Sequence, residues 1–308
     1  MFGNITANVW WYGVVADWKH EPLNNNRTQL KNNMIDLNEK PLCTIPRVMC
    51  WAVDNLELLK SQPNESVDLI YCDILYGTGR NFGEYQDLKA KRDVIESHYL
   101  PRLIEMKRVL KQNGSIYLQM DTRINHWMRI LMDKVFGYDN FQNEISWCYN
   151  SQGKTKKQWN KKHDVILFYS KSKEFTFNSH IVKDSISDLT YKRFKKEIDQ
   201  YGYYTVLKNG KRTKYYLENG SLPKDWYEDI TYISRDSKEL TGYPTQKPKE
   251  LIKRFVLASS NEGDTVADYY LGSGTTAEVC KELNRNFIGC DINPNAIEIT
   301  KARLNAGT

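Results

Sequence analysis

The 308-residue sequence predicts an α/β fold: a doubly wound, mostly parallel, Rossmann-like sheet that carries one inserted region. Strand-like and helix-like segments alternate from about residue 46 to 170, and they alternate again within 243–308. Such alternation is typical of βαβ units, whose strands lie parallel. Residues 171–242 lose the alternation, which indicates an insert within one large domain.

Apolar spacing predicts five elements in the first part. Residues 66–73 (SVDLIYCD) form an apolar run of strand length that ends in an acid. Apolar residues at helical spacing predict a helix over 98–110, and a strand over 115–120 follows it. A helix over 127–136 and a strand over 164–169 complete this part.

The remaining regions are less uniform. Residues 1–45 show no sustained periodicity and predict an irregular N-terminal arm. The insert consists of short pieces separated by Asn-Gly turns at 209–210 and 219–220. After the insert we expect helix, strand, helix, strand and helix, over ELIKRFVLASS, TVADYY, TAEVCKEL, NFIGCDI and AIEITKARL.

Composition limits the class of protein. Hydrophobic residues make up 40% and charged residues 27%, as in ordinary globular proteins. No apolar run approaches the roughly 18 residues of a membrane span, and the N-terminus lacks the basic and apolar regions of a secretory signal. Six cysteines without any CxxC pair predict reduced thiols, not disulfides or a zinc site. We therefore expect a cytoplasmic protein with no metal and no membrane partner.

The net charge of +6 is concentrated in one stretch. Residues 151–242 hold 19 Lys and Arg against 12 Asp and Glu, a net +7, and also 15 of the 38 aromatic residues. Clustered basic charge favours a polyanion, because it contacts phosphates and releases their counterions. A solvated basic face would have the same composition, so charge alone leaves both interpretations open.

The best local signal for a ligand lies between residues 264 and 291. A strand ends at Asp268-Tyr269-Tyr270, a glycine turn (Gly272-Ser273-Gly274) follows, and Thr275-Thr276 open a helix. The next strand ends at Asp291, whose carboxylate could accept hydrogen bonds from ribose hydroxyls. Glycines let the backbone approach a ligand, and the helix N-terminus offers free N–H groups to an anion. The turn lacks the spacing of dinucleotide and P-loop motifs, so S-adenosylmethionine fits better.

A second signal lies at the end of the strand over 67–73. Asp73-Ile74-Leu75-Tyr76 follows the apolar run, and Gly77-Thr78-Gly79 comes next. An acid at the carboxyl end of such a strand lies where open α/β sheets bind ligands. An ordinary polar strand end would look the same in isolation, so this signal needs the context of the others.

In these motifs the sequence resembles the β-group of amino DNA methyltransferases, which includes the modification subunits of restriction systems. That family carries [D/N/S]-P-P-[Y/F/W], often continued as DPPYGTG, and residues 73–79 read DILYGTG. The catalytic motif precedes the variable region and the cofactor motif, which is the order of the β-group. The resemblance covers about 50–170 and 243–305, and its other motifs are HDVILFYSK (163–171), YPTQKP (243–248), YLGSGTT (270–276) and FIGCDI (287–292).

The resemblance implies a site-specific DNA methyltransferase that uses S-adenosylmethionine and acts on N6 of a flipped-out adenine. Asp73 and the Leu75 carbonyl would accept the two amino hydrogens, and Tyr76 would stack on the extruded base. The cofactor pocket would be lined by Asp268, Gly272, Ser273, Gly274, Thr275, Thr276 and Asp291. Thr245, Gln246 and Lys247 would contact the methionine end of the cofactor.

The insert is then the candidate target-recognition region, within a catalytic domain formed by 46–170 and 243–308. Its candidates for phosphate contact are Lys192, Arg193, Lys195, Lys196, Lys211, Arg212 and Lys214. The implied partner is double-stranded DNA in a bacterial, archaeal or phage-infected cell. A cognate restriction enzyme and a homodimer are further candidate partners.

Two departures from the family pattern keep an alternative open. Ile74 and Leu75 replace both prolines of the catalytic motif, and the usual DPFxGSG becomes Asp-Tyr-Tyr-Leu-Gly-Ser-Gly. Prolines stiffen a loop by fixing φ, so their loss predicts a looser site. A catalytically weakened DNA-binding homologue is therefore the alternative outside the enzymes, although such a protein has little use for an intact cofactor motif.

The choice of methylated group rests on a few residues. Asp73 favours N6 of adenine, whereas N4-cytosine enzymes of the family more often begin the motif with Ser; N4 of cytosine remains the alternative within the class. Methylation of cytosine C5 would need a Pro-Cys dipeptide, and none of the nine prolines precedes a cysteine. Glutamine methylation uses Asn in the first position and does not account for the basic insert.

Overall fold

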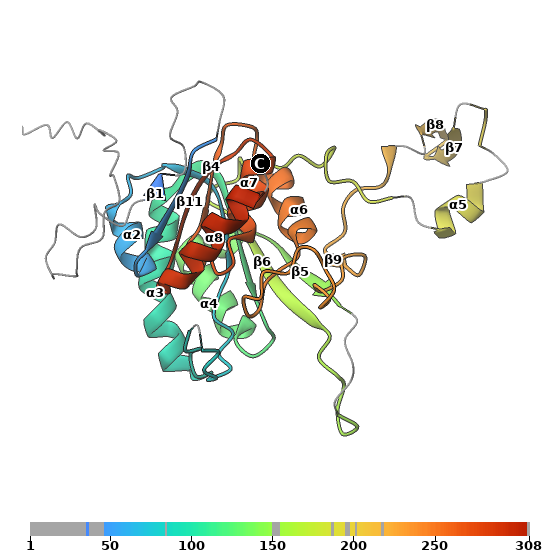
Figure 1. Cartoon of the computed structure of the whole chain (residues 1–308). Coiled ribbons are helices and arrows are strands. Elements are labelled where there is room, and N and C mark those ends of the chain that lie inside the picture. Colours follow the sequence, from blue (N-terminus) through green and yellow to red (C-terminus); the bar gives the residue numbers. More distant parts are fainter. Residues whose placement is uncertain are drawn as a thin grey trace, which may run out of the picture.

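A nine-stranded sheet forms the centre of the computed structural model, which describes residues 35–36, 46–83, 85–149, 155–185, 188–194, 198–200, 202–216 and 219–306 (Figure 1). The strand order is β1-β2-β11-β10-β3-β4-β6-β5-β9. The five strands from β2 to β4 run parallel, β6 runs antiparallel to β4, and β5 runs antiparallel to β6. The predicted doubly wound, mostly parallel sheet is confirmed. Its strands are β1 (Ile35–Asp36), β2 (Val48–Ala52), β3 (Val67–Asp73), β4 (Leu110–Met120), β5 (Phe141–Cys148), β6 (His163–Ser170), β9 (Trp226–Tyr227), β10 (Thr265–Asp268) and β11 (Asn286–Asp291).

Helices cover both faces of this sheet, each over its own hydrophobic core. One core joins the sheet to α2 (Asn55–Ser61), α3 (Arg92–Val109) and α4 (Asn125–Phe136). The other joins it to α6 (Lys249–Ser259), α7 (Thr275–Glu282) and α8 (Pro294–Ala306). Burial on both faces explains why the central strands are continuous apolar runs instead of alternating ones; six of the seven residues of β3 are buried.

The chain reverses its winding direction between two neighbouring strands, β3 and β10. These strands pair in parallel, with Leu69 opposite Val266 and Ile70 opposite Ala267. From β3 the chain continues to β4 on one side, and from β10 it continues to β11 on the other. Open α/β sheets bind ligands at such a switch point, beyond the carboxyl ends of the strands.

The structure extends several predicted elements and adds others. The helix expected over 98–110 begins earlier, at Arg92, and continues through Pro101. The strand expected over TVADYY ends at Asp268, where the chain turns into the glycine loop. β2, α2 and β5 had no sequence prediction. Within the predicted N-terminal arm, residues 35–36 pair with β2, and the other residues of 1–45 lie outside the described part of the chain.

The predicted insert contains a small unit with its own sheet. α5 (Asp188–Phe194) precedes the hairpin of β7 (Tyr203–Lys208) and β8 (Lys211–Tyr216). Asn209 and Gly210 both have positive φ (51° and 74°), as the tight turn of a two-residue hairpin requires, so the predicted turn is confirmed. Figure 1 shows α5, β7 and β8 out to one side of the main sheet. No helix in the described residues is long and apolar enough to cross a membrane.

Candidate active site

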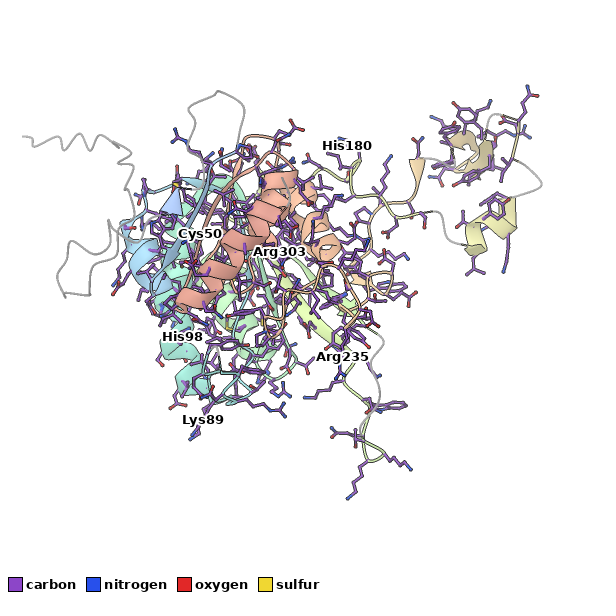
Figure 2. The ribbon with its side chains drawn as sticks, in the orientation of Figure 1. Cys50, Lys89, His98, His180, Arg235 and Arg303 are labelled. Atoms are coloured by element: carbon purple, nitrogen blue, oxygen red, sulfur yellow. The ribbon has the colours of Figure 1, made fainter. Side chains whose placement is uncertain are left out.

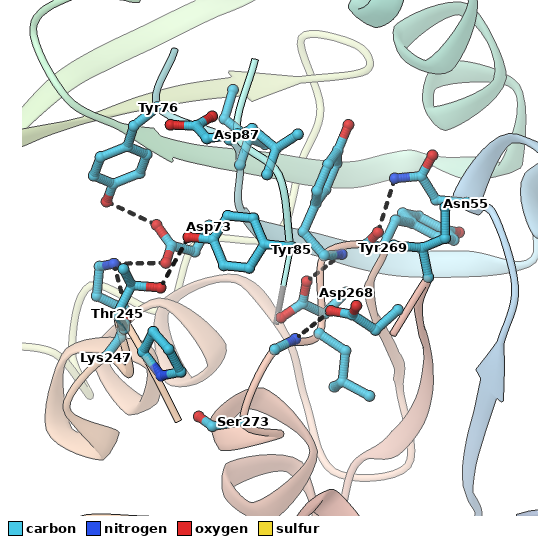
Figure 3. Close-up of a pocket in the computed structure, with 18 of the residues that line it drawn as sticks. Asn55, Asp73, Tyr76, Tyr85, Asp87, Thr245, Lys247, Asp268, Tyr269 and Ser273 are labelled. Carbon is cyan, nitrogen blue, oxygen red and sulfur yellow. Dashed lines mark hydrogen bonds and ion pairs between the residues drawn. The ribbon is translucent and has the colours of Figure 1, made fainter. Parts of the chain in front are cut away.

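One cavity of about 400 Å³ opens at the switch point, within the range of roughly 300–1,000 Å³ typical of small-molecule sites. It joins the end of β3 to the loop after β10 and to the segment before α6 (Figure 3). Of the predicted catalytic and cofactor residues, all but Gly274 line this cavity: Asp73, Leu75, Tyr76, Thr245, Gln246, Lys247, Asp268, Gly272, Ser273, Thr275, Thr276 and Asp291.

Asp73 ends β3, and both of its carboxylate oxygens are hydrogen-bonded. Oδ2 accepts from Lys247 Nζ at 2.5 Å, and Oδ1 accepts from Tyr76 Oη at 2.8 Å. Burial raises the pKa of the Asp73 carboxyl above its ordinary value, and the positive charge of Lys247 opposes this shift. The predicted catalytic acid and a predicted cofactor residue therefore form a buried ion pair.

The Tyr76 hydroxyl joins Asp73 to a second carboxylate, that of Asp164 on β6. Its oxygen lies 2.7 Å from Asp164 Oδ2. A phenol carries one hydrogen, so it can donate to only one of the two carboxylates at a time. The buried Asp164 also accepts from Gln119 Nε2 at 2.9 Å and from Tyr149 Oη at 3.1 Å. Sequence reasoning missed Asp164, although an acid inside the apolar run HDVILFYS is a signal that could have revealed it.

The loop after Asp73 is held by hydrogen bonds, although it lacks the family's prolines. The buried Asp87 accepts from the backbone N–H groups of Gly77 (3.1 Å) and Thr78 (2.7 Å), and from the Thr78 hydroxyl. Tyr99 Oη donates to the Leu75 carbonyl at 3.0 Å. These bonds restrain the loop that the missing prolines were expected to loosen. Asp87 was not among the predicted site residues.

Two carboxylates that line the cavity, Asp268 and Asp291, are both predicted to bind the cofactor. Asp268 accepts from Thr276 Oγ1 at 2.6 Å and from Tyr270 N at 3.0 Å, and its burial raises the pKa of the carboxyl to about 7. Asp291 accepts from Gly272 N at 2.9 Å and from a further backbone N–H at 2.9 Å. The backbone therefore orients Asp291 at its strand end, on the wall of the cavity.

The two glycines of the turn have different roles. Gly272 has a φ of +53° and lines the cavity, and its N–H holds Asp291. Gly274 has a φ of +75°, and a Cβ there would overlap the side chain of Thr300 on α8. Packing against α8 and the positive φ both favour glycine at 274; Gly274 does not line the cavity, and its close approach to a ligand stays a prediction.

The three residues predicted to contact the methionine end of the cofactor lie in the segment before α6, and their side chains have different partners. Thr245 lines the cavity with a φ of +62°, which is uncommon for a β-branched residue. Lys247 extends to Asp73 and also donates to the Thr245 carbonyl at 3.2 Å. The Gln246 side chain turns back into its own loop, where it accepts from Thr241 N at 2.9 Å and donates to a main-chain carbonyl.

Aromatic side chains that sequence reasoning did not single out complete the wall. Tyr85 Oη lies 3.4 Å from Thr245 Oγ1, and Figure 3 shows its ring beside Asp73. His98 Nε2 lies 3.2 Å from Tyr270 Oη; burial and the nearby Arg102 lower the pKa of this histidine to about 4. His98 is therefore a neutral wall residue at physiological pH.

The five predicted phosphate contacts that the structure describes do not line this cavity. Lys192 and Arg193 are exposed on α5, and Lys211, Arg212 and Lys214 are exposed on β8. Figure 1 shows both elements to the side of the sheet. Lys195 and Lys196 lie outside the described residues. Within the described part of the chain, no group of three or more His, Cys, Asp or Glu side chains is placed to hold a metal ion.

Comparison with known proteins gives one family. A family model for N6/N4 DNA methylases matches residues 67–302. The type II methyltransferase M.HpaI of Haemophilus parainfluenzae is 34% identical over 253 residues, which are 82% of this chain and 72% of the relative. The DNA adenine methyltransferase YhdJ of Escherichia coli K12 is 32% identical over 257 residues, 83% of this chain and 82% of the relative.

Solved structures share the fold at lower sequence identity. The PvuII DNA methyltransferase, described as cytosine-N4-specific, superposes with a TM-score of 0.59 at 16% identity, over 84% of this chain and 87% of that one. The complex of M1.HpyAVI with S-adenosylmethionine superposes with a TM-score of 0.51 at 19% identity, over 83% and 98%.

Proposed function

The chain belongs to the N6/N4 DNA methylase family, and we propose that it transfers a methyl group from S-adenosylmethionine to N6 of a flipped-out adenine in DNA. The observation that carries the proposal is that Asp73-Ile74-Leu75-Tyr76 and the glycine turn face one cavity at the switch point. The acid at the first motif position and the relative named as a DNA adenine methyltransferase support adenine.

The cavity fits S-adenosylmethionine in size and in the chemistry of its walls. Asp291, oriented by backbone N–H groups, offers acceptors for ribose hydroxyls, and the aromatic wall at Tyr85 and Tyr270 suits an adenine ring. We assign Asp268, Gly272, Ser273, Thr275, Thr276 and Asp291 to this side, with Thr245 and Lys247 next to the catalytic acid. When bound, the cofactor supplies an electrophilic methyl group on a sulfonium.

Asp73 and a main-chain carbonyl prepare the amine. An exocyclic amino group is a poor nucleophile, because its lone pair is delocalised into the ring. One amino hydrogen donated to Asp73 and the other to the Leu75 carbonyl draw the nitrogen towards a tetrahedral shape. Positioning and stabilisation of the developing positive charge then accelerate transfer. Tyr99 already orients the Leu75 carbonyl, which retains a second lone pair for the substrate.

Asp73 Oδ1 has a second lone pair for the base, and the base gains both when Tyr76 releases that oxygen. Asp164 Oδ2 lies 2.7 Å from the Tyr76 hydroxyl and offers it a second acceptor. Tyr76 can therefore release Asp73 without leaving a buried donor unpaired. The ring of Tyr76 then stacks on the extruded base. In this proposal 46–170 and 243–308 form the catalytic domain and 171–242 form the target-recognition region.

The proposal names double-stranded DNA as the partner. Because relatives are named as type II methyltransferases, we also propose that the protein acts in a restriction–modification system in the cytoplasm. Its companion there would be a restriction enzyme. A homodimer is a further part of the proposal. Light scattering of the purified protein tests the dimer. The companion is tested by asking whether a nuclease that co-purifies, or that is encoded beside this protein, cleaves unmethylated DNA.

The direct test identifies the product. Purified protein is incubated with unmethylated genomic DNA and S-adenosylmethionine, and the DNA is digested to nucleosides for mass spectrometry. We expect N6-methyldeoxyadenosine from the wild type and none from Asp73→Ala, which should still bind DNA. N4-methyldeoxycytidine would instead support the alternative base, N4 of cytosine. A wild type that binds DNA and methylates neither base would contradict the proposal and favour the weakened DNA-binding homologue.

A further inference from the structure

The loop between β5 and β6 carries most of the charge excess that the sequence analysis assigned to a longer stretch. Residues 151–162 (SQGKTKKQWNKK) contain five lysines and no acid. The insert, residues 171–242, contains 14 Lys and Arg against 11 Asp and Glu. The most basic segment of the stretch is therefore this loop, and it lies before the predicted target-recognition region.

The loop projects from the edge of the sheet that bears the catalytic motif. Met120 at the carboxyl end of β4 pairs with Val165 near the start of β6, so the loop leaves the sheet at the edge where β3 ends in Asp73. Figure 1 shows its described part, residues 155–162, extending beyond the strand ends, and in Figure 2 the exposed Lys89 and Arg235 lie at the same end of the molecule.

The base of the loop is bonded to the catalytic network. Tyr149 N donates to the Lys162 carbonyl at 2.9 Å, which continues the β5–β6 hairpin. Tyr149 Oη donates to Asp164, which also lies at hydrogen-bond distance from Tyr76. Asp164 lies five positions after Trp159, so their Cα atoms can be no more than about 18 Å apart.

The end of the loop presents one large aromatic side chain to solvent. Trp159 is 95% exposed, and the neighbouring Lys156, Lys157 and Lys161 are exposed as well. Thr155 N donates to Asn160 Oδ1 at 3.2 Å, and Asn160 Nδ2 donates to the Thr155 carbonyl at 3.2 Å. These reciprocal bonds close a turn over residues 155–160. The indole of Trp159 therefore extends into solvent from an ordered turn. An indole surrounded by lysines suits a surface that combines phosphates with stacked bases.

We propose that this hairpin end, residues 155–162, opens the DNA duplex beside the active site: its lysines bind phosphates, and Trp159 stacks in the gap that the extruded base leaves. The inference rests on the proposed function, because it concerns how the target base reaches Asp73. Proteins that distort DNA insert apolar side chains between base steps in this way, and unstacking costs a few kcal/mol per step.

The test compares paired with mispaired DNA. A short duplex is built on the site methylated by the wild type, and a second duplex carries a mismatch opposite the target base, which lowers the cost of extrusion. Trp159→Ala should slow single-turnover methylation of the paired duplex by roughly ten- to a hundredfold, given the energy of base–aromatic stacking. The mispaired duplex should restore the rate to near that of the wild type, and Trp159→Phe should be intermediate.

Controls separate this role from folding and from the proposed function. Because Trp159 is almost fully exposed, the variant should keep the wild-type melting temperature and cofactor affinity; Ile130→Ala removes an exposed side chain from α4 and should change neither rate. Equal rates for wild type and Trp159→Ala on paired DNA, or equal losses on both duplexes, would overturn the inference.

DNA-binding measurements alone test whether the lysines contact phosphates. Replacing Lys156, Lys157 and Lys161 with Ala should weaken DNA binding and reduce the slope of log K against log salt by about 0.9 for each phosphate that the loop no longer neutralises. A wild type that methylates neither duplex would refute the proposed function, yet the salt dependence would still decide this inference. An unchanged slope would overturn it.

Discussion

Lys247 Nζ lies 2.5 Å from Asp73 Oδ2, although the two residues are 174 positions apart in the sequence. Their side chains are 9% and 19% exposed, so this ion pair is largely removed from water. Lys247 also lies over the ring of Tyr76, with Nζ 5.0 Å from the ring centroid. One lysine therefore contacts both predicted catalytic side chains, and its removal should change the acid–base behaviour of the site.

We predict that Lys247→Ala moves the acid limb of the methylation rate to higher pH. Burial raises the pKa of Asp73 and Lys247 opposes that shift, so loss of the cation raises the pKa of Asp73 further. The ionised carboxylate accepts the amino hydrogen, so more alkaline buffer is then needed. Single-turnover rates from pH 5 to 9 at saturating S-adenosylmethionine measure the limb. Lys247→Arg should retain most of the wild-type profile, and a limb that stays in place or moves to lower pH would contradict the prediction.

Asp164 should act through Tyr76 and not independently of it. Asp164→Ala removes the second acceptor of the Tyr76 hydroxyl and should lower the single-turnover rate by roughly tenfold or more, as expected for a hydrogen bond to a charged group. In Tyr76→Phe the hydroxyl is already absent, so adding Asp164→Ala should cost little more. Asp164→Asn, which keeps an acceptor oxygen, serves as the conservative variant. Additive losses in the double variant would show that Asp164 has a separate structural role.

Asp87 should be required for the order of the catalytic loop. Asp87→Ala leaves the N–H groups of Gly77 and Thr78 without their acceptor, at a cost of about 1–3 kcal/mol for each buried group. We expect melting several degrees lower and a clear loss of turnover, with smaller effects in Asp87→Asn. Differential scanning calorimetry and steady-state methylation measure the two. Wild-type turnover in Asp87→Ala would show that the loop is ordered by other contacts.

The buried Asp268 should make stability depend on pH. Its pKa is about 7 in the folded protein, against about 3.9 in an unfolded chain. Because the folded-state pKa is the higher one, this carboxyl contributes its full stability below the unfolded value and loses it as pH rises through about 7. The free energy of unfolding should therefore fall from pH 5 to pH 8 in the wild type more than in Asp268→Asn, by on the order of a few kcal/mol.

Urea denaturation of both proteins at several pH values checks this expectation. The comparison with Asp268→Asn cancels the contribution of the other titrating groups, which the two proteins share. Parallel pH dependences in wild type and variant would show that Asp268 is ionised in the folded protein throughout this range.

Sequence patterns were sufficient for the fold class, because the alternation of strands and helices depends on local periodicity, although β2, α2 and β5 had no prediction. Apolar runs with acids at or near their carboxyl ends predicted that Asp73, Asp268 and Asp291 lie where strands end, and the structure has each of them at the last position of its strand. Parallel pairing then requires those ends to share one edge of the sheet. Motif order was sufficient for the family, which the match over residues 67–302 confirms.

Other features had no local signature. Composition located the positive charge only within 151–242, because a sum over a window does not show which part of it faces the active site. The turn after β10 predicted two glycines that approach a ligand, yet a Cβ at Gly274 would also overlap Thr300, on a helix that begins 20 residues later. Local spacing does not reveal which later element packs on a turn.

The sequence by itself determined the class of fold, the family and the acids at the ends of three strands. Only the tertiary structure decided their partners: Lys247 for Asp73, Asp164 for Tyr76, and Asp87 for the loop that lacks its prolines. The physical reason is that periodicity specifies which face of an element is buried, whereas a buried polar group takes its partner from whatever donors the packed elements bring within about 3 Å. That choice depends on strand register and helix placement, which are properties of the whole chain.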